Sequence, residues 1–301
     1  MHPLISVKEL LGLLPRAPVN GAADAPDEAT LRVIDCRFSL ADPEQGQRDF
    51  DRAHIPGAIY AHLERELSGA VEFGRTGRHP LPELSRFTHQ LGLWGIGPST
   101  RVVAYDDGPG AFAARLWWLL RYLGHRQVQV LDGGLASYLR AGGTLSEKLA
   151  APVATVFQAQ LQPSMVATLD EVSLRSQSTD PLLFDARAAD RFRGENETID
   201  PIPGHIPGAQ SLPFVGNLEN GQFLSLERLR ERFVEAWGSD THAGEVIVYC
   251  GSGVTACHHV LAAQAAGLEG LRLYPGSYSE WIADRRRPVA VGDPPAQATS
   301  V

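Results

Sequence analysis

The sequence has few cysteines, no long apolar run and no excess of positive charge. Its three cysteines, Cys36, Cys250 and Cys257, are too few for a disulfide framework in 301 residues. The first ten residues lack the basic and apolar regions of a signal peptide, and no run of about 18 uncharged apolar residues follows. The net charge of −8 argues against nucleic acid and anionic membranes as general partners. We therefore expect a cytoplasmic protein with no nucleic-acid and no membrane partner.

An internal repeat organises the chain. The segment His54–Ala58, which reads HIPGA, recurs as His205–Ala209 at an offset of 151 residues. Three further pairs of segments match in the same order, namely 31–37 with 182–187, 101–106 with 246–250, and 130–134 with 273–277. A length of 301 residues with 44% hydrophobic residues allows two domains, each with its own core. The sequence therefore predicts a duplicated domain.

Strand patterns alternate with helix patterns in the first copy. The expected strands are 33–34, 102–105 and 128–131, and the expected helices are 84–91, 111–122 and 136–140. Such alternation implies right-handed crossovers and an α/β fold with a doubly wound, mostly parallel sheet flanked by helices. Ligands of these sheets bind at the carboxyl ends of the strands.

We expect one domain over 1–145 and a second over 164–292. A linker over 146–163 begins after glycines and contains an alternating apolar pattern, which indicates an extended connector packed against one domain. The last residues, 293–301, are rich in proline and small polar residues, and we expect a loose tail there.

Cys250 stands between an apolar strand pattern at 246–249 and a helix pattern at 256–266. A short loop at this junction directs backbone N–H groups toward one point at a helix N-terminus, where anions and thiolates are stabilised. Gly251 and Gly253 allow the backbone dihedrals that a tight loop requires. The pattern predicts a cysteine nucleophile in an anion-binding loop. The alternative is a buried apolar cysteine that ends a core strand.

The paired HIPGA turns, the CGSGVTA loop that begins at Cys250 and the duplication together resemble the tandem-domain rhodanese, or sulfurtransferase, family over essentially the whole chain. The resemblance implies two tandem rhodanese-like domains, with a C-terminal catalytic domain whose cysteine forms a persulfide. Asp106 stands where the first copy would have its cysteine, so we expect the N-terminal domain to be non-catalytic. The implied reaction moves sulfane sulfur from a small-molecule donor to cyanide, a thiol or a thioredoxin-type acceptor, without a cofactor or a metal ion.

The loop sequence also carries an implication for the donor. In the family, CGSGVT is typical of members that use 3-mercaptopyruvate, whereas members that use thiosulfate tend to carry basic residues just after the cysteine. We expect Gly251, Gly253, Val254 and Thr255 to contact the substrate. For Thr255, the alternative role is to cap the following helix.

Two arginines hold the substrate in family members that use 3-mercaptopyruvate. Arg191 matches the first of them, but the second falls near Asp200, where no arginine stands. Arg193 is the candidate substitute, because a guanidinium two residues away can reach a carboxylate bidentately. Its alternative role is that of a surface salt-bridge partner. We therefore favour 3-mercaptopyruvate as donor, with thiosulfate as the alternative.

Family members of this type are also proposed to use a serine, a histidine and an aspartate. Ser252 matches the serine, His54 the histidine, and Asp49 the acid. A histidine in this place can pass a proton to the leaving group. Because His205 occupies the equivalent turn of the second copy, the alternative is that both turn histidines are structural.

We consider three other functions for the cysteine loop, and the sequence argues against the first two. A phosphatase of related fold would need an arginine at position 256, where this chain has Ala256. A metal site over Cys250, Cys257 and the two following histidines lacks the spacing of paired ligands. The third is a non-catalytic sulfur carrier whose cysteine receives sulfur from a partner, and only turnover separates it from an enzyme.

Overall fold

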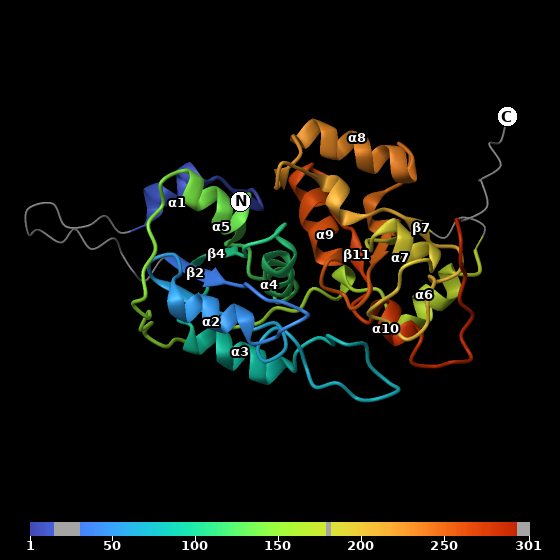
Figure 1. Ribbon diagram of the computed structural model, residues 1–301, viewed down its shortest axis with the longest axis horizontal. Helices are drawn as coiled ribbons and strands as arrows, with labels where there is room; N and C mark the ends of the chain where they lie inside the picture. The colour runs from blue at the N-terminus through green and yellow to red at the C-terminus, as the bar shows by residue number, and fades with distance from the viewer. Residues whose placement is uncertain (15–30, 179–181, 294–301) are drawn as a thin grey trace, which may run out of the picture. The chain divides into compact units, whose positions relative to one another are not determined.

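The computed structural model describes residues 1–14, 31–178 and 182–293, and these form two compact units (Figure 1). Unit 1 is formed by the described residues of 1–70, 81–163 and 218–224, and unit 2 by those of 71–80, 164–217 and 225–293. Two short segments therefore group with the unit that the other copy builds. The predicted domain boundaries did not include this exchange. The predicted tail lies outside the described residues from position 294 onward.

Unit 1 contains a five-stranded parallel sheet in the order β1-β5-β4-β2-β3. Its strands are β1 (Leu4–Ile5), β2 (Leu31–Asp35), β3 (Ala58–Tyr60), β4 (Arg101–Tyr105) and β5 (Val128–Leu131). A two-stranded antiparallel hairpin, β8 (Leu218–Glu219) with β9 (Gln222–Phe223), also belongs to this unit. Consecutive residues of β4 are buried, which requires that helices or loops cover both faces of the sheet.

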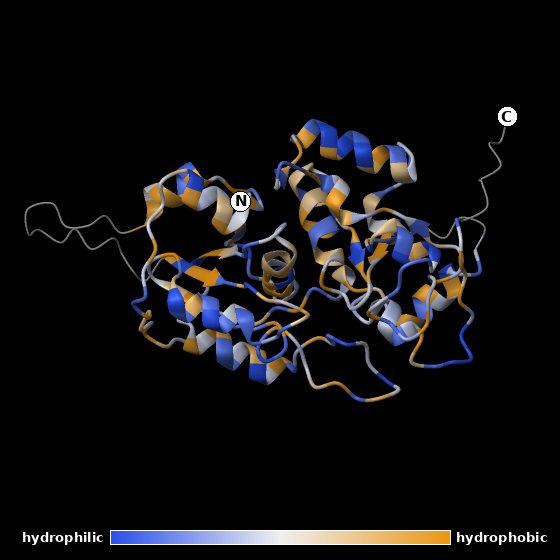
Figure 2. Cartoon of the chain, in the orientation of Figure 1, coloured by the Kyte–Doolittle hydropathy of each residue, from blue (hydrophilic) through white to orange (hydrophobic). Residues whose placement is uncertain are grey.

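The described residues of unit 1 also form five helices: α1 (Val7–Leu13), α2 (Gln45–Arg52), α3 (Leu84–Leu93), α4 (Ala111–Tyr122) and α5 (Gly134–Arg140). Helix α4 is apolar around most of its circumference and is buried against β4 and β5. Helix α2 is mostly hydrophilic, whereas β2 is hydrophobic (Figure 2). Among the side chains of α2, that of Phe50 packs into a core cluster with residues such as Val33 and Leu10.

Unit 2 contains a four-stranded parallel sheet in the order β11-β10-β6-β7. Its strands are β6 (Leu183–Asp185), β7 (Gln210–Ser211), β10 (Ile247–Tyr249) and β11 (Arg272–Leu273). Its helices are α6 (Leu169–Arg175), α7 (Ala189–Arg193), α8 (Leu226–Trp237), α9 (Ala256–Ala265) and α10 (Ser277–Trp281). The predicted α/β class, with mostly parallel sheets flanked by helices, is confirmed in both units.

The duplication extends to a buried ion pair. Asp35 pairs with Arg37 at 2.7 Å in unit 1, and Asp185 pairs with Arg187 at 2.6 Å in unit 2. Each arginine also donates to the carbonyl oxygen of the residue just before the histidine of its HIPGA turn. The ion pair thereby fixes the turn to the carboxyl end of a strand in both copies.

Backbone hydrogen bonds hold the connector between the copies along unit 1. The N–H of Thr155 donates to the carbonyl of Gly92, and the N–H of Gln160 donates to that of Leu123, both at 2.9 Å. The connector is therefore held against one unit, as the alternating pattern predicted. Within the described residues, none of the helices has the length and apolar character needed to cross a membrane.

Candidate active site

Cys250 follows β10 directly and lies in the loop that leads to α9. Its side chain is buried, with 2% of the residue exposed. The N–H of Gly253 donates to Cys250 Sγ at 3.1 Å, and the N–H of Cys250 itself donates to Ser277 Oγ at 3.1 Å. One backbone N–H of the loop therefore donates to the sulfur, and the expected anion-binding role of the loop stays a prediction.

The start of α10 fixes this loop from outside. The N–H groups of Tyr278 and Ser279 donate to the carbonyl oxygens of Cys250 and Gly251, each at 2.9 Å. Gly253 has φ +77°, and an added Cβ there would lie 2.2 Å from the carbonyl oxygen of Pro275. Glycine is required at 253 both for the dihedral angle and for this close approach.

Ser252 and His79 form a hydrogen-bonded pair next to Cys250. Ser252 Oγ lies 2.7 Å from His79 Nδ1, and both residues are buried. His79 belongs to the segment 71–80 that groups with unit 2. The structure therefore places a histidine at the predicted serine, but this histidine is not the one that sequence reasoning selected.

His54, the histidine selected from the sequence, has its ring nitrogens elsewhere. Its Nδ1 lies 2.7 Å from the carbonyl oxygen of Phe50, and its Nε2 lies 3.1 Å from that of Lys148. The ring also stacks on Phe50 at 4.0 Å between centroids. His205 repeats the arrangement, with Nδ1 2.8 Å from the carbonyl of Phe192 and a stacked ring. These contacts favour the structural alternative for both turn histidines.

Asp49, the predicted acid of the same set, lies on α2 in unit 1. Its carboxylate pairs with Arg52 at 3.1 Å on the partly exposed side of the helix. This local ion pair gives Asp49 a partner on its own helix, and its part as the acid of the set stays a prediction. His54 and Asp49 were assigned by matching a serine, histidine and aspartate set of the resembled family, and His54 instead serves the HIPGA turn itself.

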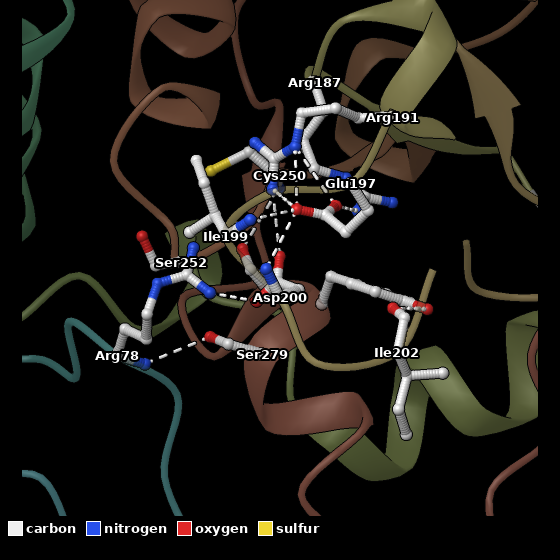
Figure 3. A network of polar contacts seen from close by, with 12 residues as sticks. Arg78, Arg187, Arg191, Glu197, Ile199, Asp200, Ile202, Cys250, Ser252 and Ser279 are labelled. Atoms are coloured by element: carbon white, nitrogen blue, oxygen red, sulfur yellow. Dashed lines mark hydrogen bonds and ion pairs between the residues drawn. The ribbon is translucent and has the colours of Figure 1, made fainter. Parts of the chain in front are cut away.

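Two arginines and a carboxylate meet beside the Cys250 loop (Figure 3). Arg191 Nη2 lies 3.0 Å from Asp200 Oδ2, and Arg78 Nη1 forms an ion pair with Asp200 Oδ1. An added Cβ at Gly251 would lie 2.8 Å from Arg78 Nη2 and 3.7 Å from Arg191 Nη2. Gly251 thus leaves room for two guanidinium groups next to the cysteine.

Arg78 therefore provides a second guanidinium group beside Asp200, where the sequence analysis found no arginine. Arg78 precedes His79 in the segment 71–80. The N–H of Arg78 donates to Ser279 Oγ at 3.0 Å, and this hydrogen bond holds the segment against α10. Sequence reasoning missed both residues. The available signal was a polar stretch with two arginines and a histidine, 75–79, in a chain whose expected site lacked one arginine.

Arg187 and Glu197 extend the network away from the loop. Arg187 pairs with Glu197 at 3.3 Å, and Arg191 pairs with it at 2.9 Å. Burial raises the pKa of Glu197, but hydrogen bonds from Arg191 and from the backbone N–H groups of Asp200 and Ile199 lower it more, and the net result is below its ordinary value. For Asp200, burial outweighs the attraction of Arg78 and Arg191, and its pKa is raised.

Arg193, the predicted substitute arginine, is held elsewhere. Its Nε and Nη2 donate to the two carboxylate oxygens of Glu195 at 2.9 and 2.7 Å. Both side chains are partly exposed. This is the surface salt bridge that the sequence analysis gave as the alternative, and the site's second guanidinium comes from Arg78 instead.

The remaining loop residues have packing roles that the structure makes visible. Val254 is buried, and Thr255 caps α9 by position, although its side chain makes no capping hydrogen bond to the described residues. Cys257 is fully buried, and its Sγ donates to the carbonyl of Gly253 at 3.2 Å. His259 lies with Nδ1 2.9 Å from the amide nitrogen of Asn217. Cys257 and His259 thus serve the packing of the loop and of α9.

The equivalent loop of unit 1 is filled by its own carboxylate. Asp106 Oδ1 accepts hydrogen bonds from the N–H groups of Gly108 and Gly110, and Oδ2 accepts from those of Phe112 and Ala113, all between 3.0 and 3.1 Å. The first copy keeps an anion-binding loop after its strand, but a side chain of the loop occupies it. This copy has no thiol there.

The fold and site together are typical of a cysteine-dependent enzyme that acts on small anions, built from two copies of a parallel α/β domain. Comparison with known proteins specifies the family. Residues 19–141 and 168–284 each match the rhodanese-like domain. A probable 3-mercaptopyruvate sulfurtransferase from Pseudomonas aeruginosa is 50% identical over 270 residues, which cover 88% of this chain and 94% of that protein.

Two further comparisons agree. A putative thiosulfate sulfurtransferase from Mycobacterium tuberculosis is 37% identical, over 93% of this chain and 97% of that protein. The crystal structure of a 3-mercaptopyruvate sulfurtransferase from Escherichia coli has a TM-score of 0.76 and 28% identity, over 93% of this chain and all of that one. The chain therefore belongs to the rhodanese family. The predicted family and the predicted enzyme class, that of the sulfurtransferases, are confirmed.

Proposed function

We propose that this protein transfers sulfane sulfur from 3-mercaptopyruvate to a thiophilic acceptor through a persulfide on Cys250. The observation that carries the proposal is the loop around the sulfur. The N–H of Gly253 donates to Cys250 Sγ at 3.1 Å, while guanidinium nitrogens of Arg78 and Arg191 lie close to Gly251. A thiolate and an anionic donor are thereby stabilised next to each other.

In the first half-reaction, the Cys250 thiolate attacks the sulfur of 3-mercaptopyruvate. A sulfur–sulfur bond forms while the carbon–sulfur bond breaks, and the electron pair of the broken bond leaves with the carbon as the enolate of pyruvate. Arg78 and Arg191 hold the carboxylate and the keto oxygen during this step. The enolate then takes one proton to give pyruvate, and Cys250 carries the outer sulfur as a persulfide.

The Ser252–His79 pair supplies that proton. With Ser252 Oγ and His79 Nδ1 2.7 Å apart, the serine hydroxyl gives its proton to the enolate carbon and regains one from the protonated ring. This assigns to His79 the part that the sequence analysis gave to His54.

In the second half-reaction, cyanide or a thiolate attacks the outer sulfur of the persulfide. The bond to Cys250 Sγ breaks, the thiolate is regenerated, and the acceptor leaves as thiocyanate or as a new persulfide. A small thiol and a thioredoxin-type protein both satisfy this chemistry.

Thiosulfate is the second candidate donor, and the relative from Mycobacterium tuberculosis favours it by name. Two features favour 3-mercaptopyruvate. The second guanidinium is supplied by Arg78, and the Ser252–His79 pair provides a proton that an enolate needs and a sulfite leaving group does not. The 50% identical relative carries the same donor in its name.

We place this reaction in the cytoplasm as part of the same proposal. Cys36, Cys250 and Cys257 form no disulfide within the described part of the chain, and a persulfide enzyme needs its cysteine reduced. A reducing compartment suits both requirements.

Thiocyanate release from the full-length protein tests the function. With 3-mercaptopyruvate and cyanide, we expect repeated turnover, and after donor alone we expect the intact mass to rise by one sulfur atom. Cys250→Ser should lose both signals, whereas Cys36→Ser, the control at a buried cysteine of unit 1, should keep them. Turnover by the Cys250→Ser variant would exclude the mechanism. A single persulfidation without release to cyanide would instead identify a sulfur carrier.

A further inference from the structure

Asp200 occupies the position next to Cys250 that a donor anion has to reach. Its Oδ2 would lie 3.6 Å from a Cβ on Gly251, close to the two guanidinium nitrogens that flank the same point. It pairs with Arg78 through one oxygen and with Arg191 through the other. The Asp200 carboxylate thus lies between the two guanidinium groups and binds one with each of its oxygens.

The Asp200 side chain is shielded from water, with none of its surface exposed. Bridging two guanidinium groups with the two oxygens of one carboxylate is the arrangement in which a substrate carboxylate would bind. The arginines are therefore engaged by an internal anion in the structure described here.

The charges of this cluster also balance. Three arginines, Arg78, Arg187 and Arg191, face three carboxylates, those of Asp185, Glu197 and Asp200. With all six groups ionised the cluster carries no net charge. An anion that enters a neutral cluster loses its hydration free energy, and no net charge of the cluster compensates this loss. A dianion loses more hydration free energy than a monoanion.

We propose that Asp200 is an internal competitor of the donor and the residue that sets donor affinity and preference. The donor binds by displacing the Asp200 carboxylate from Arg78 and Arg191. An α-keto carboxylate has the same charge and planar shape as the Asp200 carboxylate that it replaces. Thiosulfate is a dianion and therefore binds less favourably at this site. The inference rests on the proposed function, because it concerns the donor site of that reaction.

Steady-state kinetics of the variant Asp200→Asn test whether Asp200 competes with the donor. Asparagine keeps the shape of the side chain and one oxygen acceptor, but it removes the charge that competes with the donor. The KM for 3-mercaptopyruvate should fall roughly tenfold, and the KM for thiosulfate should fall by more, because a dianion gains about twice the Coulomb energy. The kcat for 3-mercaptopyruvate should change by less than about threefold, because the reacting sulfur and its proton source are untouched.

Asp284→Asn is the matched control. Asp284 pairs with Arg286 through both oxygens at 2.9 Å, in unit 2 but outside the cluster. This variant changes the net charge by the same amount and should leave both KM values within about twofold of the wild type, because exposed pairs contribute little. A similar fall of KM in both variants would assign the effect to overall charge and overturn the inference.

A rise of either KM in Asp200→Asn, or no change, would also overturn it, since Asp200 would then position the arginines rather than compete with the donor. Asp200→Ser, with thermal unfolding as a check, replaces the Asn variant if the latter does not fold. Failure of the proposed function looks different, because the wild type would then release thiocyanate from neither donor.

Anion binding without turnover gives an independent measurement. Pyruvate and sulfate serve as the probes, and protection of Cys250 from iodoacetamide reports their binding. We expect half-protection of Asp200→Asn at roughly tenfold lower pyruvate than in the wild type, with a larger shift for sulfate. Equal concentrations in the two proteins would contradict competition by Asp200, whatever the activity with sulfur donors.

Discussion

Replacing Gly253 by alanine tests how far the Cys250 loop depends on one close approach of two backbone segments. Gly253 has φ +77°, and its N–H donates to Cys250 Sγ. An added Cβ would lie 2.2 Å from the carbonyl oxygen of Pro275, far inside van der Waals contact. Since that oxygen belongs to the backbone, the loop itself or the turn at 275 has to move.

Two costs add in this variant. A residue with a Cβ in the left-handed region costs roughly 1–2 kcal/mol. Forcing a methyl group into a filled space costs roughly 1–3 kcal/mol more. We therefore expect the free energy of unfolding to fall by about 2–5 kcal/mol. The displaced N–H also ceases to donate to the sulfur, and loss of one such donor lowers kcat by about a hundredfold or more.

Gly57→Ala is the matched control for the dihedral cost. Gly57 has the same φ of +77°, but no described atom lies within 4 Å of an added Cβ there. This variant should lose only roughly 1–2 kcal/mol and keep its activity. Urea unfolding measures the stability of both variants, and the rate of Cys250 alkylation by iodoacetamide reports the loop. The reasoning is refuted if Gly253→Ala is no less stable than Gly57→Ala, or if its cysteine is alkylated at the wild-type rate.

Two further predictions concern histidines. His79→Asn should lower kcat for 3-mercaptopyruvate by about a hundredfold and spare thiosulfate, because only the enolate needs a proton. His54→Asn should reduce the free energy of unfolding and leave kcat near the wild-type value, and the opposite pattern in steady-state kinetics would return the catalytic role to His54. Burial lowers the pKa of His259 from 6.5 to about 4. The folded state therefore resists its protonation, and stability should fall by about 3 kcal/mol as the pH drops from 6.5 to 4. In urea unfolding across this range, His259→Gln should flatten the slope, and an unchanged slope would exclude His259 as its source.

The elements that the sequence predicted well are those whose residues are buried on all sides. Helix α4 and strand β5 have the predicted bounds, because a mostly apolar segment leaves little choice of where the element begins and ends. The helix predicted at 136–140 begins at Gly134, since a glycine start gives no apolar signal. Helix α2 was not predicted. Its charged sequence has one core anchor, Phe50, and the close approach of Gly46 to the carbonyl of Arg37 is invisible in the pattern.

The site was predictable where it is local. Cys250, its glycines and Ser252 follow one strand, and the hydrogen bond from the N–H of Gly253 to Cys250 Sγ spans only three residues. The partner of Ser252 lies 173 residues earlier in the chain, and Arg78 pairs with Asp200 across 122 residues. No periodicity records such contacts. They depend on a loop of the first copy that groups with the second unit, and only the three-dimensional structure brings them together.

The repeat itself explains why such a loop is present. The segments that change units are 71–80 and 218–224, and removing the offset of 151 residues aligns the second with 67–73, which overlaps the first. The two exchanged segments thus come from overlapping parts of the repeat, with 71–73 common to both. In unit 1 the N–H of Phe223 donates to Asp132 Oδ1 at 2.9 Å, just before α5, and in unit 2 the N–H of Arg78 donates to Ser279 Oγ at 3.0 Å, within α10.

The first copy lacks a thiol at its own loop, but its residues 71–80 belong to the unit that contains Cys250. Asp106 closes the anion-binding loop of unit 1 with its own carboxylate, so that copy cannot hold a sulfur donor there. The same copy provides Arg78 and His79 to the unit that contains Cys250. Under the proposed function, the absence of a thiol from the first copy takes no group from the Cys250 site, whereas replacement of the exchanged loop would remove a guanidinium and an imidazole together.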